Sequence, residues 1–332
     1  MLASFSRRRF AQAVTAATLA TRLQPGSEGS GRAQDAAPLF SYPMGLPGRA
    51  LGDGAQVRIG YACENTPYYP GWWHTGENWN LIAGDTTAAG VYATAAGQVV
   101  FAGYDYPGPV VIIQHAADLY SMYGHLDYDL AVAQGQAVER GQLVGQPLAW
   151  PGDATRSHLH FELRTFFTQP EINGDAPQFG VHCGYECPPG PGYWPMAAPQ
   201  HPSALGWRNP THVINRRAWP GGVPDGLTVV VSAAAPESTP LWTAAEDAPG
   251  AELLADLPLA AGDQYPLLSV DAGAEAATGA SAEAYRLWYR IALPDSSDGW
   301  VQAAIPLALE TGSDGRPSSV RLDFLPEVVT PA

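Results

Sequence analysis

The stretch Ser157-His158-Leu159-His160-Phe161-Glu162-Leu163 carries two histidines two positions apart in an alternating run. Side chains of an extended strand point alternately to opposite faces, so His158, His160 and Glu162 share one face and the intervening apolar residues share the other. We predict a strand whose apolar face packs on a core and whose other face presents two imidazoles, which are common zinc ligands. Glu162 is then either an acceptor that fixes one imidazole tautomer or a surface carboxylate.

Upstream of this stretch, His74 and His125 lie in two further segments of interest. In His74-Thr75-Gly76-Glu77-Asn78, the glycine and the two preceding tryptophans favour extended chain over helix. On one strand His74 and Asn78 would face the same way, with Gly76 leaving space between them and Glu77 turned away. His125 follows in Tyr123-Gly124-His125, at the end of another expected strand.

Together these segments resemble the M23 or LytM-type metallopeptidases, the family of lysostaphin, which cut the peptide part of bacterial cell walls. The family motif combines His-x3-Asp, a later Tyr-x-His and a final His-x-His, and the resemblance covers roughly residues 56–165. It implies an antiparallel β-sheet metallopeptidase domain and a zinc-dependent endopeptidase that hydrolyses peptidoglycan peptides with one Zn²⁺ per chain.

Carried over residue by residue, the resemblance places His74, Asn78 and His160 at the metal-ligand positions. It places His125 and His158 at the two catalytic positions that do not bind metal. These two histidines would orient or deprotonate the attacking water and stabilise the charge on the carbonyl oxygen, and the sequence leaves open which of them is the base.

Position 78 departs from the family, which has aspartate there. An amide keeps an oxygen at the same reach but removes one negative charge, so a divalent ion is held less strongly. The alternative function is therefore a catalytically impaired M23-like domain that binds the cell wall or regulates another hydrolase. A structural β protein whose histidines only stabilise the sheet is a third reading.

The amino-acid composition narrows the range of possible binding partners. The chain has 332 residues, enough for two domains, and a net charge of −15, which argues against nucleic acid and anionic membranes as partners. The 36 glycines and 31 prolines, with few charged residues, indicate a turn-rich, mainly β protein.

Residues 1–37 are expected to form an export signal and linker. Three consecutive arginines at 7–9 precede a short alanine-rich stretch at 11–20, and this order resembles a twin-arginine signal. Ten residues cannot span a bilayer, which needs about 20, and no other segment is apolar enough to do so. We predict an exported protein of the cell envelope or exterior without a membrane span in its mature form.

The three cysteines leave several arrangements open. Cys183 can pair with Cys187, or Cys63 can pair with either of them, in an oxidising compartment. A zinc knuckle of Cys183, Cys187 and His182 is the alternative. His115 ends a strand and is expected to be structural.

The peptidase domain is expected over residues 38–222. Its core strands are predicted at 57–61, 91–94, 97–102, 110–115, 120–125 and 142–145, with the apolar run 110–113 buried on both sides. Residues 166–222 are an aromatic, proline-rich extension that either lines a substrate groove or, as we favour, covers the sheet edge.

A second domain is expected over residues 226–310. Six short strands are predicted at 227–231, 239–242, 251–257, 265–270, 287–291 and 299–302. The segments Trp288-Tyr289-Arg290-Ile291 and Asp298-Gly299-Trp300-Val301 resemble bacterial SH3-like barrels, which implies a small β-barrel that takes a cell-wall ligand. Residues 311–332 are expected to be a tail.

Overall fold

The computed structural model describes residues 40–103, 107–181, 183–217, 223, 226–272 and 285–326. The predicted export signal and linker, 1–37, lie outside these residues. The fold is mainly β, as predicted, and every strand pairing in the described ranges is antiparallel. Within these ranges no helix combines the length and hydrophobicity that a membrane crossing requires.

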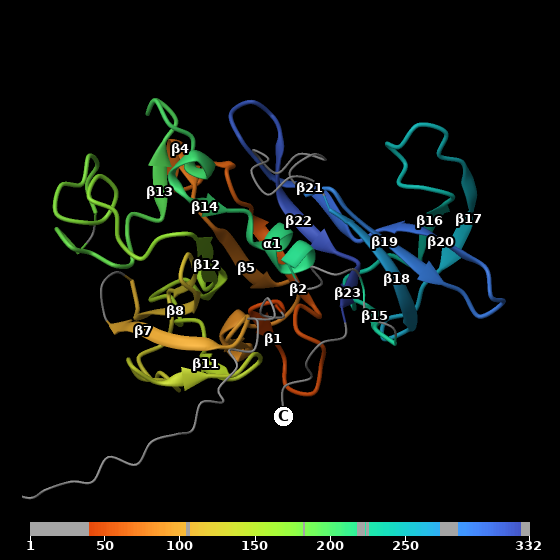
Figure 1. Ribbon diagram of the computed structural model, residues 1–332, viewed down its shortest axis with the longest axis horizontal. Helices are drawn as coiled ribbons and strands as arrows, with labels where there is room; N and C mark the ends of the chain where they lie inside the picture. Colours follow the sequence, from red (N-terminus) through yellow and green to blue (C-terminus); the bar gives the residue numbers. More distant parts are fainter. Residues whose placement is uncertain are drawn as a thin grey trace, which may run out of the picture. The chain divides into compact units, whose positions relative to one another are not determined.

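The largest sheet has ten strands and includes His115 and His160 (Figure 1). Its order is β10 (Ala137–Val138), β7 (Gly97–Gly103), β8 (Val110–Ala116), β9 (Leu119–Gly124), β12 (Leu159–Arg164), β5 (Glu77–Leu81), β2 (Ala55–Ile59), β22 (Pro317–Leu322) and β21 (Ala304–Thr311), with β14 (Trp207–Arg208) also paired to β12. The six strands predicted for the peptidase core are confirmed within a few residues, because their apolar patterns match strand periodicity.

The centre of this sheet is buried on both faces. All four residues of the apolar run 110–113 in β8 are fully buried, as predicted for a central strand. In β12, Leu159, Phe161 and Leu163 have no exposed surface and belong to the main apolar core. The sheet is therefore a rigid base for the polar side chains that β12 carries.

The prediction of one strand through His74 and Asn78 is wrong. The chain bends at 75–76, so β4 (Tyr69–His74) ends in a separate small sheet with β3 (Glu64–Asn65) and β13 (Tyr193–Pro195), while β5 joins the large sheet. Gly76 does not leave an open space either, since a Cβ there would lie 2.4 Å from the Phe161 carbonyl oxygen. Glycine is needed because the bend crosses close to β12.

A second small sheet packs beside the first strands of the chain. It joins β1 (Met44–Gly45), β6 (Gly90–Tyr92) and β11 (Leu143–Gly145). Three short 3₁₀ helices, η1 (Thr86–Ala88), η2 (Ala154–Arg156) and η3 (Pro202–Leu205), and one helix, α1 (Pro210–Arg217), complete the described elements.

The six strands predicted for residues 226–310 are confirmed, but a closed barrel is not. They form a seven-stranded sheet in the order β17 (Leu253–Pro258), β16 (Ser238–Trp242), β20 (Asp298–Gln302), β19 (Leu287–Ala292), β18 (Gln264–Ala272), β15 (Thr228–Val231) and β23 (Phe324–Pro326). Among the described residues β17 and β23 do not pair with each other, so the sheet has two open edges.

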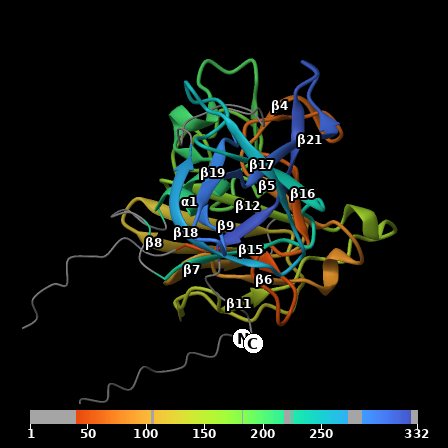
Figure 2. The same cartoon turned by 90° about the vertical axis from the view of Figure 1, so that its right-hand side faces the viewer.

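The C-terminal residues join both sheets. Strands β21 and β22, drawn in blue, pair beside β2, although 258 residues or more separate β22 from β2 in the sequence (Figure 1). Residues 317–326, which the sequence leaves in the tail, thus form β22 and β23. Figure 2 shows β21 close to β4, and hydrogen bonds connect their hairpins: Thr66 Oγ1 donates to the Thr311 carbonyl at 2.7 Å.

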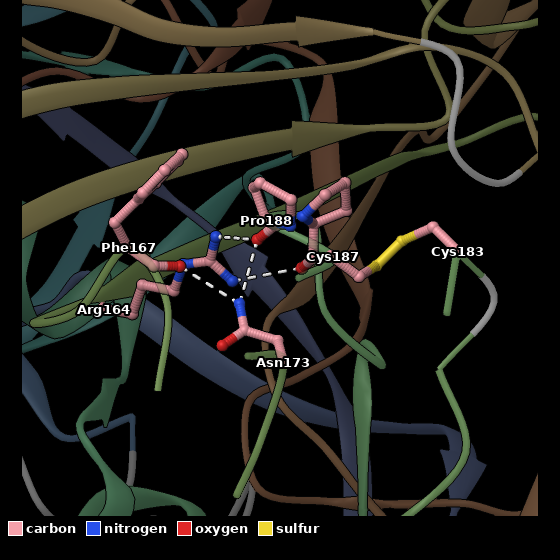
Figure 3. Close-up of a disulfide and its surroundings, with 7 residues drawn as sticks. Arg164, Phe167, Asn173, Cys183, Cys187 and Pro188 are labelled. Carbon is pink, nitrogen blue, oxygen red and sulfur yellow. Dashed lines mark hydrogen bonds between the residues drawn. A yellow bond between two sulfur atoms is a disulfide. The ribbon is translucent and has the colours of Figure 1, made fainter. Parts of the chain in front are cut away.

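The aromatic extension packs at the C-terminal end of β12, a central strand of the large sheet. Phe166, Trp194 and Trp207 form a buried cluster, and β14 extends the sheet next to β12. Figure 3 shows how the extension is fixed: the Arg164 guanidinium donates to the Pro188 carbonyl at 2.5 Å, beside a disulfide between Cys183 and Cys187. The disulfide excludes the pairings with Cys63 and the predicted zinc knuckle, whose third member, His182, lies outside the described residues.

Candidate metal centre and active site

Strand register brings the predicted site residues together from distant segments. Asn78 in β5 lies directly opposite His160 in β12. On the other side of β12, Gly124 of β9 lies opposite His160, which brings His125 to the same place. His74 reaches the group from the end of β4. Four segments thus meet on one face of the sheet.

Three donor atoms converge at the centre of this group. His74 Nε2 lies 3.0 Å from His160 Nδ1, and His160 Nδ1 lies 3.2 Å from Asn78 Oδ1. All three side chains are almost completely buried. Whether a proton or a cation occupies this point depends on the tautomers of the two rings.

The tautomers follow from the outer contacts of the rings. His74 Nδ1 lies 3.2 Å from the Gly60 carbonyl oxygen, which can only accept, so Nδ1 carries the proton. His160 Nε2 lies 3.2 Å from Glu162 Oε1, so the proton of this ring lies on Nε2. Glu162 is the acceptor that the sequence allows for, and it is fixed by Thr75 Oγ1 at 2.6 Å and Trp207 Nε1 at 3.1 Å.

When each ring carries only the proton assigned above, His74 Nε2 and His160 Nδ1 present lone pairs toward Asn78 Oδ1, which is also an acceptor. Burial, and secondarily the nearby His160, lowers the pKa of His74 well below its ordinary value, so a second proton on that ring is disfavoured. Three buried acceptors facing one another without a proton are unfavourable unless a cation lies between them. The donor set therefore has the chemistry of a cation site.

The spacing also fits zinc. Zn–N bonds of about 2.0–2.1 Å in a tetrahedron place neighbouring donors about 3.3 Å apart. The donor separations of 3.0 and 3.2 Å are close to that value. Across the described ranges no three His, Cys, Asp or Glu side chains are grouped for metal binding, and the third donor here is the amide of Asn78.

His125 and His158 lie beside these donors. Their ring centroids are 4.7 Å apart, and the His125 centroid is 6.1 Å from that of His160. His125 Nδ1 donates to the Pro107 carbonyl at 2.8 Å, and His158 Nδ1 donates to the Arg156 carbonyl at 2.6 Å. Both contacts put the ring proton on Nδ1 and leave Nε2 able to accept one.

The environment keeps both of these rings neutral. Burial lowers the pKa of His158 to about 4, and burial, followed by the charge of His158, lowers that of His125 well below its ordinary range. His125 has φ 60°, a left-handed conformation that is uncommon for a residue with a Cβ. Such backbone outliers cluster at functional sites, where the surrounding structure holds them in place.

A cavity of about 290 Å³ opens next to these two histidines. It is lined by Tyr68, Tyr69, Pro107, His125, Trp150, Arg156, His158 and Tyr193. Tyr193 comes from the aromatic extension, so the extension contributes to the cavity. The cavity walls are mainly aromatic with a few polar groups, which is common in ligand-binding pockets.

The sequence did not single out Trp150 or Arg156. Arg156 precedes His158 by two residues, and this spacing is the signal that could have drawn attention to it. His115 is structural, as expected: Nδ1 donates to the Ala96 carbonyl at 2.9 Å and Nε2 lies 2.8 Å from Ser121 Oγ.

Known proteins resemble this part of the chain. Residues 74–175 match the profile of Peptidase family M23. An uncharacterized protein of Haemophilus influenzae is 35% identical over 84 residues, which are 25% of this chain and 20% of that protein. The chain thus spans about one fifth of the length of this curated relative.

Two solved structures show weaker overall similarity. A zinc-containing peptidase from Vibrio cholerae is 28% identical over 38% of this chain and 36% of its own, with a TM-score of 0.28. Lysostaphin from Staphylococcus simulans is 11% identical over 82% of this chain and 95% of its own, with a TM-score of 0.32.

The family match includes the segments that supply His74, Asn78, His125, His158 and His160. Residues 74–175 of this chain are therefore similar to the M23 peptidase family over all five of these positions.

Proposed function

We propose that this protein is a zinc-dependent endopeptidase that hydrolyses peptide bonds in bacterial peptidoglycan. The observation that carries the proposal is the convergence of three buried lone-pair donors beside two neutral imidazoles that line a cavity. The match to Peptidase family M23 supports the reaction class and the wall peptide as substrate.

In this proposal His74, Asn78 and His160 hold one zinc ion. Zinc bound there would polarise the scissile carbonyl and make a nearby water more acidic. Glu162 orients His160 by accepting from Nε2, and the Gly60 carbonyl orients His74 in the same way. These outer contacts keep both ligand nitrogens unprotonated and correctly directed.

His125 and His158 handle protons. Each is neutral and carries its ring proton on the nitrogen that faces a backbone carbonyl, so each can accept a proton at Nε2. The ring that gains the proton becomes a cation that can donate to the carbonyl oxygen as negative charge develops on it. Both rings line the cavity, so a substrate bound there would contact them.

One observation favours the alternative, a catalytically impaired domain that binds the wall or regulates another hydrolase. The amide of Asn78 can turn so that its NH₂ group donates to the lone pairs of His160 and His74. The three side chains would then satisfy one another without a metal. The two functions differ in metal content and are separated by the experiments below.

The remaining parts of the proposal concern the location of the protein and the role of its second domain. We propose that residues 1–37 direct export by a twin-arginine-like signal, so that the protein acts in the cell envelope or outside the cell. Residues 226–310 are proposed to be a second, SH3-like domain that takes a ligand in the wall. Neither nucleic acid nor a membrane span of the mature chain belongs to this function.

The first test is metal analysis combined with digestion of purified cell wall. The protein should contain about one zinc per chain and release peptides that mass spectrometry identifies. His160→Ala should remove zinc and activity together, whereas His125→Ala should keep zinc and lose activity. His115→Gln is the control histidine variant and should keep both at neutral pH. A protein without zinc that binds wall but does not cut it would favour the alternative.

The second test addresses position 78. Asn78→Asp restores a carboxylate 3.2 Å from His160 Nδ1 and should tighten zinc binding by at least about tenfold, measured as retention against chelators. Unchanged retention would show that residue 78 does not contact the metal. A wild-type chain that lacks activity, together with an active Asn78→Asp variant, would identify Asn78 as the residue that impairs the domain.

A further inference from the structure

Arg156 lies in the wall of the cavity that His125 and His158 also line. Its guanidinium carbon is 5.2 Å from the centre of the Tyr68 ring and 5.1 Å from the centre of the Trp150 ring. Tyr68 comes from the β3–β4 hairpin and Trp150 from the segment before η2. The guanidinium thus contacts two aromatic rings from separate segments.

These contacts leave the N–H edge of Arg156 without an acceptor among the described residues. The side chain makes neither a hydrogen bond nor an ion pair with them, and it is only partly exposed. Asp153 is near enough to sense its charge, but Asp153 Oδ1 accepts from Thr155 N at 3.1 Å and Thr155 Oγ1 at 2.5 Å. The neighbouring Arg58 differs, because it is paired with Glu310 at 2.9 Å.

This arrangement is unusual in a chain with a net charge of −15, where acidic residues outnumber basic ones by 32 to 17. An arginine that were present only for solubility would extend into solvent. Stacking between two rings instead holds the guanidinium plane in one orientation, so that little side-chain entropy is lost when it binds an anion. Arginine recognises carboxylates through two parallel N–H···O bonds.

We infer that Arg156 binds a carboxylate of the substrate and makes the cavity specific for acidic peptides. The inference rests on the proposed function, because it identifies the substrate class of that same site. Trp150 contacts Arg156 on one side and stacks near His158 on the other, with a ring separation of 6.3 Å. Since an extended peptide spans about 3.3–3.6 Å per residue, the carboxylate would lie within about three residues of the scissile bond.

The test compares two forms of one peptide. The probes are the wall stem tetrapeptide with free carboxylates and the same peptide with every carboxylate converted to a carboxamide. Binding is measured by stopped-flow tryptophan fluorescence, which detects the complex before turnover and uses Trp150 in the cavity as a reporter. The proteins are the wild type, Arg156→Gln, Arg156→Lys and a control, Arg290→Gln, which removes an arginine that pairs with Asp298 in the seven-stranded sheet.

We expect the wild type and Arg290→Gln to bind the carboxylate peptide at least about tenfold more tightly than the carboxamide peptide. Arg156→Gln should bind both peptides equally and weakly, and Arg156→Lys should keep part of the preference because it keeps the charge but not the planar fork. Circular dichroism verifies that each variant is folded. Equal binding of both peptides by the wild type, absence of binding to either, or a preference that survives in Arg156→Gln would overturn the inference.

The peptide-binding result and the wall-digestion result can fail separately. If the wild type prefers the carboxylate peptide but does not digest wall, Arg156 has the assigned role in a binding domain, and the endopeptidase proposal fails. If the wild type digests wall without any preference, the endopeptidase proposal holds and the role of Arg156 fails.

Discussion

Tyr285 connects the C-terminal part of the chain to the strand that carries Asn78. Its hydroxyl accepts from the Tyr61 backbone N–H at 2.8 Å and donates to Glu77 Oε1 at 3.0 Å. Both partners are completely buried, and Tyr285 is 1% exposed. Tyr285→Phe keeps the ring but removes this hydroxyl, so it isolates the contribution of these two hydrogen bonds.

The expected loss of stability follows from the two groups, the Tyr61 N–H and the Glu77 carboxylate, that lose a hydrogen bond when the hydroxyl is removed. A buried N–H without an acceptor costs about 1–3 kcal/mol, and a hydrogen bond to a charged group contributes about 1.5–3 kcal/mol. The carboxylate keeps two donors, Trp79 Nε1 and the Thr211 backbone N–H, so the second contribution should be near the lower end. We expect Tyr285→Phe to lower the free energy of unfolding by about 2–4 kcal/mol.

The assay is urea denaturation followed by tryptophan fluorescence and circular dichroism. It is done at pH 8, because burial raises the pKa of Glu77 to about 7 and the carboxylate must be ionised. Tyr265→Phe is the control, since the Tyr265 hydroxyl makes no hydrogen bond with the described residues, and it should change the free energy by less than about 0.5 kcal/mol.

The result also tests how the chain is organised. If the C-terminal strands and the ten-stranded sheet unfold as one unit, both probes should give a single transition that shifts in Tyr285→Phe. A change below about 0.5 kcal/mol, or a second transition that alone carries the shift, would refute the reasoning that this hydroxyl connects them.

Two further substitutions test the sheet around the site. Gly76→Ala places a Cβ 2.4 Å from the Phe161 carbonyl oxygen. It should lower the free energy of unfolding by at least about 2 kcal/mol and weaken zinc retention. Gly180→Ala is the control, because the space around Gly180 is open, and it should change neither quantity. Burial lowers the pKa of His115 to about 4, so this histidine stabilises the fold above pH 6.5 and loses that contribution as the pH falls toward 4. Between pH 7 and 4 the wild type should lose up to about 3 kcal/mol more than His115→Gln, less to the extent that solvent reaches the ring, and parallel unfolding curves would contradict this.

The local pattern of the sequence predicted the central strands of the ten-stranded sheet and six strands of the seven-stranded sheet, but not β21, β22 or β23. Alternation in 157–163 gave the face on which His158, His160 and Glu162 lie, and the apolar run 110–113 gave a strand buried on both sides. The order and spacing of the histidines also identified the segments that meet at the site, because these signals depend on neighbours in the sequence.

Other features could not be predicted in this way. The strand expected through His74 and Asn78 is broken at 75–76, because the close approach of β12 to Gly76 becomes apparent only in the folded sheet. Arg156 stacks between Tyr68, which is 88 positions away in the sequence, and Trp150, which is six positions away. No local sequence period marks this contact.

The sequence by itself indicated many of the strands and the side chains that can bind a metal or move a proton. The tertiary structure alone decided that β21 and β22 complete the ten-stranded sheet, that Tyr285 contacts Glu77, and that the side chains of His74, Asn78 and His160 converge. The physical reason is that strand periodicity is a property of adjacent residues, whereas register and convergence depend on pairings between segments that only the folded chain brings together.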